Sequence, residues 1–331
     1  MSAKSRALCI FLFASVTWAQ EGTDENALAT KVRALNVSGQ RESQVPFFGA
    51  FGFPQCDNEG NLYFQLDKGD FAHSDVLRLS SDGRRGKTFK FSGEYADLEF
   101  SSFFVSRQND ALYVLAWRKR KFYLVGFDSN GDMRNPVALD LPEFVIPEDL
   151  IVFEDGSSLI SGYFESRAPT ELRGQVYTAI FESSGKLRRH LSLNQPDVVL
   201  ADAATKLREG GAALGHDGSI YLLSSREVLV LSRRGEFRRK IRFQKPDPQD
   251  IVTNFYVSGG FLVIGLSGDT ERILEKRKFV VLELPSGRLY AVYEAPQELH
   301  GAQDVCFTRD QGFTFMIASN GRTTLFNAPL R

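Results

Sequence analysis

The sequence predicts an all-β protein, a six-bladed β-propeller whose blades are four-stranded antiparallel sheets. Two observations lead to this prediction. The chain of 331 residues contains 28 Phe, 10 Tyr and 28 Gly but only 3 Met, a composition that favours strands and tight turns over helices. One pattern also recurs along the chain, in which a polar turn, a short apolar strand, a second apolar strand and a glycine turn follow one another.

The spacing of this repeat sets the expected number of blades. The glycine of the second turn recurs at intervals of 48, 54, 50 and 52 residues, at Gly83, Gly131, Gly185, Gly235 and Gly287. A period near 50 residues with about four strands per unit is typical of β-propeller blades. A sixth copy near the end of the chain lacks a fourth strand.

The N-terminal part of the chain offers a replacement for that missing strand. Residues 30–37 alternate between polar and apolar side chains. We predict that this strand completes the last blade and closes the ring, which would leave no open edge between the first and last blades. A single propeller domain would then span residues 30–331.

Residues 1–19 have the three parts of a secretory signal. Lys4 and Arg6 form a basic start, residues 7–14 are mostly apolar, and Thr17-Trp18-Ala19 is a small-x-small cleavage site. We predict cleavage after Ala19, a flexible segment at residues 20–29 and a secreted or periplasmic protein. No other segment approaches the length of a membrane span.

The charge balance indicates that the molecule as a whole is not attracted to polyanions. The 40 Lys and Arg residues are matched by 41 Asp and Glu residues, which gives a formal charge of −1. A chain with so little net charge has no global field that would attract nucleic acid or an anionic membrane. We expect no nucleic-acid partner, no membrane span and a monomeric propeller.

Two cysteines remain after the predicted cleavage. Cys56 and Cys306 lie in the first and the last repeats, whereas Cys9 leaves with the signal. In an oxidising compartment the two could pair, and the disulfide would close a long loop. Two buried thiols that pack as small apolar groups are the alternative, and the sequence leaves both open.

The repeats resemble a known class of propellers. The segments Asp217–Leu223 and Asp57–Phe64 are similar to repeats of six-bladed propellers of the NHL-repeat-like class, and the resemblance covers about residues 30 to 331. The WD-repeat pattern is missing, because Trp117 is followed by Arg118. The resemblance implies a propeller fold in a class of mostly binding platforms, of which the gluconolactonase-like members are metal-dependent lactonases.

The sequence contains no familiar catalytic motif. It lacks the Gly-x-Ser-x-Gly of a nucleophile elbow and the His-Glu-x-x-His of a zinc site, and its four histidines have no ligand spacing. We therefore assign no catalytic residue, and whether the protein is an enzyme stays open. We expect no cofactor, with Ca²⁺ or another divalent cation as the alternative.

Acidic residues stand before the expected innermost strand of four repeats, at Asp97, Asp149, Asp250 and Asp304. The connections that enter the inner strands of a propeller lie on one face around its channel. These carboxylates could therefore converge on the channel mouth and attract a cation or a basic group. The alternative is that each one pairs with a neighbouring cation or with backbone amides.

Basic residues occupy two loops expected on the same face, at Arg118, Lys119, Arg120, Lys276 and Arg277. An acidic centre with a partly basic rim suits a protein or a polyanionic glycan. Charged hairpin tips that keep a blade edge soluble are the alternative.

Together these patterns predict a secreted or periplasmic, non-catalytic binding platform for a protein or glycan partner. A metal-dependent hydrolase of the lactonase-like propeller kind is the main alternative, because the same aspartates could hold a metal. A structural part of a larger envelope assembly is a third possibility.

Overall fold

The computed structural model describes residues 32–44, 50–66, 69–70, 72–191, 211–223, 227–268, 277–299, 301–319 and 322–330. At residues 50–53, 254 and 304 only the backbone is described. The predicted signal sequence and the segment 20–29 lie outside these ranges. The description below concerns the compact unit at residues 31–331.

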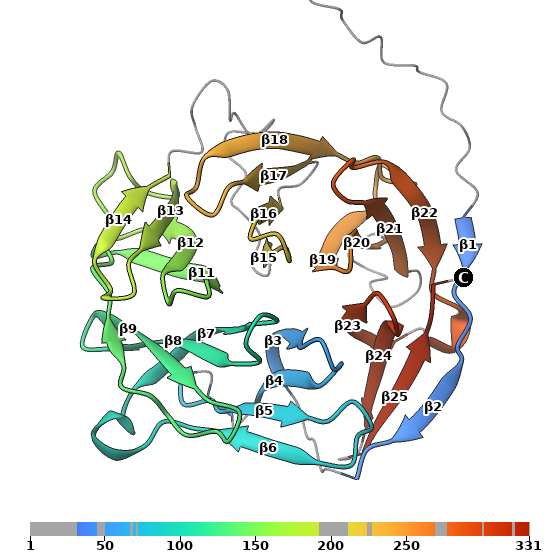
Figure 1. Ribbon diagram of the computed structural model, residues 1–331, viewed down its shortest axis with the longest axis horizontal. Helices are drawn as coiled ribbons and strands as arrows, with labels where there is room; N and C mark the ends of the chain where they lie inside the picture. The colour runs from blue at the N-terminus through green and yellow to red at the C-terminus, as the bar shows by residue number, and fades with distance from the viewer. Residues whose placement is uncertain are drawn as a thin grey trace, which may run out of the picture. The chain divides into compact units, whose positions relative to one another are not determined.

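Six sheets form a ring (Figure 1), which confirms the predicted six-bladed β-propeller with four-stranded antiparallel blades. The strands of blades 1 to 3 are β3 (Ala50–Cys56), β4 (Leu62–Leu66), β5 (Val76–Leu79), β6 (Gly86–Phe89); β7 (Glu99–Val105), β8 (Leu112–Arg118), β9 (Lys121–Phe127), β10 (Val137–Ala138); and β11 (Val145–Val152), β12 (Ser158–Phe164), β13 (Val176–Phe181), β14 (Leu187–His190).

Blades 4 to 6 follow the same order, but the last outer strand comes from the start of the chain. Their strands are β15 (Ala212–Leu214), β16 (Ile220–Leu223), β17 (Glu227–Leu231), β18 (Phe237–Arg242); β19 (Ile251–Ser258), β20 (Phe261–Ser267), β21 (Arg277–Glu283), β22 (Leu289–Glu294); and β23 (Gln303–Thr308), β24 (Gly312–Ser319), β25 (Arg322–Ala328), β2 (Gly39–Glu42).

The first strand of each blade is the innermost one. The strands β3, β7, β11, β15, β19 and β23 each contact the first strand of the next blade, and β23 contacts β3 to close the circle. The fourth strands lie on the outside of the ring (Figure 1). The blades are held together by apolar side chains from facing sheets, as where the rings of Phe279 in blade 5 and Phe313 in blade 6 have centroids 4.3 Å apart.

The second turn of blades 1 to 5 has a glycine with positive φ, which explains why the period is visible in the sequence. In blade 3, Gly185 has a φ of +84°, a left-handed conformation that residues with a side chain rarely adopt. A Cβ atom at this position would also collide with the carbonyl oxygen of Ala138 in the preceding blade. Conformation and the close approach of blade 2 therefore both select glycine here.

The strand that closes the ring is not the one expected at residues 30–37. Its beginning, β1 (Val32–Ala34), pairs in parallel with β22 and adds a fifth strand to blade 5. The closing strand is β2 (Gly39–Glu42), which pairs with β25 of blade 6. Because β2 is an exposed outer strand, its residues carry no apolar alternation that could have revealed it.

Leu35 anchors this N-terminal segment between blades 5 and 6. It lies just after β1, is 2% exposed and belongs to the apolar cluster that contains Phe279 of β21 and Phe315 of β24. Its backbone N–H donates to the carbonyl oxygen of Glu294 at 2.9 Å. The side chain therefore holds the chain in place before β2 reaches the last blade.

Replacing Leu35 with alanine is expected to lower the free energy of unfolding by about 2 kcal/mol, because three buried side-chain carbons are lost and a cavity remains. Urea denaturation measures the change. Val32→Ala is the matched control, since Val32 is 40% exposed on the neighbouring strand and should alter stability by less than about 0.5 kcal/mol. Equal effects of the two variants would show that Leu35 does not anchor the segment.

No helix in the described ranges has the length and apolar character needed to cross a membrane.

Candidate functional site

A cavity of about 510 Å³ occupies the channel at the centre of the ring. Residues of the inner strands β3, β7, β11, β15 and β19 line it, together with residues of the turns that follow several of these strands. The size lies within the range of about 300 to 1,000 Å³ that is usual for small-molecule sites. The centre of the ring is therefore the first candidate for a binding site.

Aromatic side chains supply much of the apolar lining. Phe103 and Phe104 come from β7, and Phe255 comes from β19. These side chains are 7%, 8% and 8% exposed, whereas Phe307 and Phe313 between blades are fully buried. The channel phenylalanines therefore keep a small accessible surface where they border the cavity.

Bulges in the inner strands bring polar residues to the same cavity. The pairing of the first and second strands shifts register in blades 1, 2, 3, 5 and 6. In β7 and β11 the residues skipped by the register are Ser101 and Glu148, and both line the cavity. A bulge re-aims the side chains around it, so these polar groups reach the channel from strands that otherwise pack on neighbouring blades.

Asp149 follows the bulge of β11 and is the carboxylate most enclosed at the cavity, with 5% of its surface exposed. Gln65 on β4 is similarly buried at 3% and also lines the cavity. These groups can form hydrogen bonds to a ligand that enters the channel.

Gln55 joins the inner edges of blades 1 and 2. Its side-chain amide donates to the carbonyl oxygen of Phe103 at 2.6 Å and accepts from the N–H of Val105 at 2.8 Å. The side chain thus satisfies backbone groups of β7 that face the channel, as a paired strand would do elsewhere.

His216 and Asp217 line the cavity from the turn after β15. Asp217 accepts hydrogen bonds from the N–H of Ser219 at 3.0 Å and from its hydroxyl at 2.7 Å. Burial acts to raise the pKa of Asp217, but the hydrogen bonds from Ser219 and the charge of Arg238 together outweigh it, and the pKa lies below its ordinary value. Asp217 is therefore ionised at neutral pH and adds negative charge to this part of the cavity.

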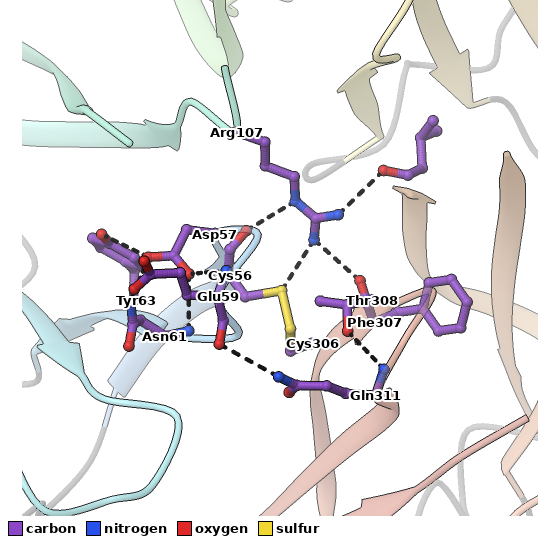
Figure 2. The surroundings of a disulfide bond; sticks show 11 residues. Cys56, Asp57, Glu59, Asn61, Tyr63, Arg107, Cys306, Phe307, Thr308 and Gln311 are labelled. Carbon is purple, nitrogen blue, oxygen red and sulfur yellow. Dashed lines mark hydrogen bonds between the residues drawn. A yellow bond between two sulfur atoms is a disulfide. The ribbon is translucent and has the colours of Figure 1, made fainter. Parts of the chain in front are cut away.

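Arg107 reaches across the channel from the turn after β7 (Figure 2). Its guanidinium donates to the carbonyl oxygens of Cys56 at 3.0 Å, Phe307 at 3.1 Å and Val257 at 3.4 Å. The three acceptors belong to the inner strands β3, β23 and β19, respectively. One side chain from blade 2 therefore connects the inner strands of blades 1, 6 and 5. Burial lowers the pKa of Arg107 to about 10, which leaves the group charged at neutral pH.

Cys56 and Cys306 form a disulfide beside this arginine, with an S–S distance of 2.04 Å. The bond joins β3 of blade 1 to β23 of blade 6 (Figure 2), and Arg107 donates to the Sγ of Cys56 at 3.0 Å. Of the two arrangements left open by the sequence, the structure contains the paired one. The disulfide connects blade 1 to blade 6 next to the channel.

The four acidic residues expected at the channel mouth have different surroundings. Of the three whose side chains the structure describes, only Asp149 lines the cavity. Asp250, which is 2% exposed, forms an ion pair with Lys278 at 3.0 Å, and Asp97 on the surface forms one with Arg118 at 2.7 Å. The side chain of Asp304 lies outside the described residues.

The expected basic rim is partly engaged in local contacts. The Arg118 guanidinium lies over the rings of Tyr95 and Tyr123, and its hydrogen bond holds the pKa of Asp97 below its ordinary value. Lys119 and Arg120 form the turn between β8 and β9, where Arg120 pairs with Glu143 at 2.9 Å. Arg277 begins β21, while Lys276 is outside the described ranges.

Sequence reasoning missed Arg107, Gln55 and His216 as channel residues. Arg107 stands directly after an inner strand, but its acceptors come from segments up to 200 residues away, so no local pattern marks it. His216 was visible only as part of a repeated turn. No group of three or more His, Cys, Asp or Glu side chains within the described part of the chain is arranged to hold a metal ion.

The fold and the channel define a six-bladed β-propeller with a central ligand-sized cavity. No family model matches the chain, and no curated protein matches it, so the resemblance to NHL-repeat propellers stays a prediction.

Solved structures share the fold at low sequence identity. A presumed exported protein of Bacteroides fragilis has a TM-score of 0.56 and 10% identity over 91% of this chain and 99% of its own. The gluconolactonase XC5397 of Xanthomonas campestris has a TM-score of 0.53 and 15% identity over 90% and 95% of the two chains. A luciferin-regenerating enzyme has a TM-score of 0.51 and 10% identity over 88% and 98%. At these identities the likeness concerns the fold alone.

Proposed function

We propose that this protein is a non-catalytic binding protein that acts after export and takes a hydroxyl-rich ligand, a glycan or a glycan-bearing partner, into its central cavity. The observation that carries the proposal is the composition of the cavity wall. Aromatic rings and hydrogen-bonding groups from different blades border one space of about 510 Å³. The expectation of export rests on the three-part N-terminal sequence pattern.

The polar groups of the cavity suit a neutral ligand with many hydroxyl groups. Carboxylates such as Asp149 accept hydrogen bonds only, whereas amides such as Gln65 and Gln108 both donate and accept. A sugar hydroxyl can meet either kind of group because it also donates and accepts. The apolar surfaces of Phe103 and Phe104 can cover the less polar faces of a sugar ring.

A binding function is also consistent with how the cavity is stiffened. Gln55 and Arg107 fasten the inner strands of four blades to one another through their hydrogen bonds. A site built on fixed strands loses little conformational freedom when a ligand binds, which favours affinity. The wall is therefore preorganised for its ligand.

The proposal predicts that a soluble oligosaccharide from a panel of neutral di- to tetrasaccharides binds the full chain in isothermal titration calorimetry. Asp149→Asn and the cavity-filling Ser101→Leu should each weaken this binding by about tenfold or more, since each removes or blocks polar contacts worth about 1.4 kcal/mol or more. Asp97→Asn is the matched control, because Asp97 is exposed and outside the cavity, and should leave the affinity within about twofold.

Two results would overturn the proposal. The first is a panel in which no oligosaccharide binds, or in which the cavity variants behave like Asp97→Asn. The second is hydrolysis of a sugar lactone by the purified protein that disappears with EDTA and returns with Ca²⁺, which would support the metal-dependent hydrolase instead.

A further inference from the structure

Three outer strands present an exposed apolar side chain at the same structural position. Leu187 of β14, Phe237 of β18 and Leu289 of β22 are 46%, 37% and 42% exposed. Each pairs with the last apolar residue of the third strand, directly after a register shift that recurs in blades 3, 4 and 5. The three positions are therefore equivalent by strand pairing, and Tyr290 beside Leu289 adds a fourth exposed apolar side chain at 38%.

The described strands of the other blades do not repeat this feature. The corresponding position in blade 1 is Gly86, and in blade 2 it is the partly buried Met133. Blade 6 is completed by β2, whose residues are polar. The exposed apolar side chains thus form an arc over three consecutive blades, which we call the apolar arc and define as Leu187, Phe237, Leu289 and Tyr290.

Cations surround the part of the arc on blades 3 and 4. Residues 182–190 and 232–242 contain nine Lys or Arg residues and two Glu residues, although the whole chain has a charge of −1. The second turn of blade 4 packs on blade 3, since a Cβ on Gly235 would meet the side chains of Leu191 and Ile180. The two basic segments therefore lie side by side.

Direct contacts place these cations together at the outside of the ring. Arg189 of β14 donates from Nη1 to the carbonyl oxygen of Arg234 at 3.2 Å, and Arg233 pairs with Asp155 of blade 3 at 2.9 Å. Arg188 and Arg234 are exposed, and within the described residues neither contacts a carboxylate. Their charge is therefore available to an external anion.

The equivalent positions lie at the same level along the axis of the propeller, because each one follows a third-to-fourth-strand turn and these turns are on the same face of the ring. Figure 1 shows β14, β18 and β22 on the outside of consecutive blades. A partner that touches all three positions at once must be broad and nearly flat. A bilayer surface has this shape, and it accepts apolar side chains flanked by Lys and Arg at its interface.

We propose that the apolar arc and the adjacent cations dock the propeller onto an anionic lipid surface. The apolar side chains enter the interface, while Lys186, Arg188, Arg234 and their neighbours face the acidic headgroups. Stable peripheral binding generally needs two such signals together. This surface is separate from the central cavity, so the inference does not depend on the proposed ligand.

Sedimentation of the full chain with lipid vesicles tests the proposal. Binding is expected with phosphatidylcholine vesicles that contain phosphatidylglycerol, and it should be much weaker with phosphatidylcholine alone or at high salt. The double variant Arg188→Glu/Arg234→Glu should reduce the partition coefficient by about tenfold or more, since each cation near the surface contributes about fivefold. All variants carry the same N-terminal residues, so the apolar run at 7–14 affects each one equally.

Matched variants distinguish this surface from a general charge effect. Lys119→Glu/Lys121→Glu changes the net charge equally at exposed sites of the second-to-third-strand turn of blade 2, which lies on the opposite face of the propeller, and should leave binding within about twofold of the wild type. Leu187→Ser/Phe237→Ser should reduce vesicle binding, whereas Val32→Ser/Ile146→Ser, at sites 40% and 38% exposed, should not.

Two outcomes would overturn the proposal. One is vesicle binding that the matched pairs alter as strongly as the arc variants do, or that is absent. The other is vesicle binding unaffected by Leu187→Ser/Phe237→Ser together with tight binding to heparin, which would indicate a site for a soluble polyanion. Circular dichroism of each variant excludes loss of the fold as the cause.

Discussion

Replacing both Cys56 and Cys306 with alanine is expected to lower the free energy of unfolding by about 5 kcal/mol. The disulfide joins residues 250 positions apart, so in the unfolded chain it closes a very long loop and removes much of its conformational freedom. In the folded ring it links blade 1 to blade 6, which are also joined by the hydrogen bonds of Arg107 and by the contact between β3 and β23. Urea denaturation of the oxidised wild type and the double variant measures the difference.

Reductant provides the matched control for this prediction. Reduction should destabilise the wild type by a similar amount, because it opens the same loop, and it should leave the cysteine-free variant unchanged. A wild type whose stability is the same with and without reductant would show that the crosslink does not stabilise the ring.

The blade repeat could be predicted because its turns have strict chemical requirements. At Gly185 both the left-handed conformation and the nearness of blade 2 select glycine. In the first turn of a blade, an aspartate such as Asp217 accepts a hydrogen bond from the N–H two residues later, and Asp57 and Asp155 do the same in blades 1 and 3. These constraints act within a few residues and so remain visible in the sequence.

The closing strand could not be predicted by the same reasoning. Apolar alternation marks strands that bury one face, whereas β2 is exposed along its length except for partly buried Arg41. The alternation at residues 30–37 instead reflects Leu35, which is buried without belonging to a strand of the last blade. The prediction that an N-terminal strand completes the last blade is therefore confirmed, but the strand is β2 and not residues 30–37.

The channel residues depend on strand pairing that the sequence does not reveal. Asp149 was expected before an inner strand, but β11 begins at Val145 and Asp149 reaches the cavity because of a bulge against β12. Asp250 looks equivalent in sequence, yet it pairs with Lys278 of the same blade. Whether an aspartate faces the channel or a neighbouring cation thus depends on register.

Replacing Arg107 with methionine is expected to lower the free energy of unfolding by about 4 kcal/mol. Methionine keeps an unbranched apolar side chain but removes the charged donor shared by the carbonyl oxygens of Cys56, Val257 and Phe307. Each hydrogen bond to a charged group contributes about 1.5 to 3 kcal/mol, and water in the cavity can replace part of that loss. Urea denaturation at neutral pH measures the change.

Two further variants show whether position and geometry matter. Arg309 occupies the corresponding turn of blade 6 and is exposed, so Arg309→Met should change stability by less than about 0.5 kcal/mol. Arg107→Lys should be intermediate, because an ammonium keeps the charge but lacks the planar fork that reaches several acceptors at once. If Arg107→Lys were as stable as the wild type, the charge alone would suffice and Arg107 would not tie the inner strands together. If Arg107→Met were as stable as Arg309→Met, neither the charge nor the hydrogen bonds would hold the channel.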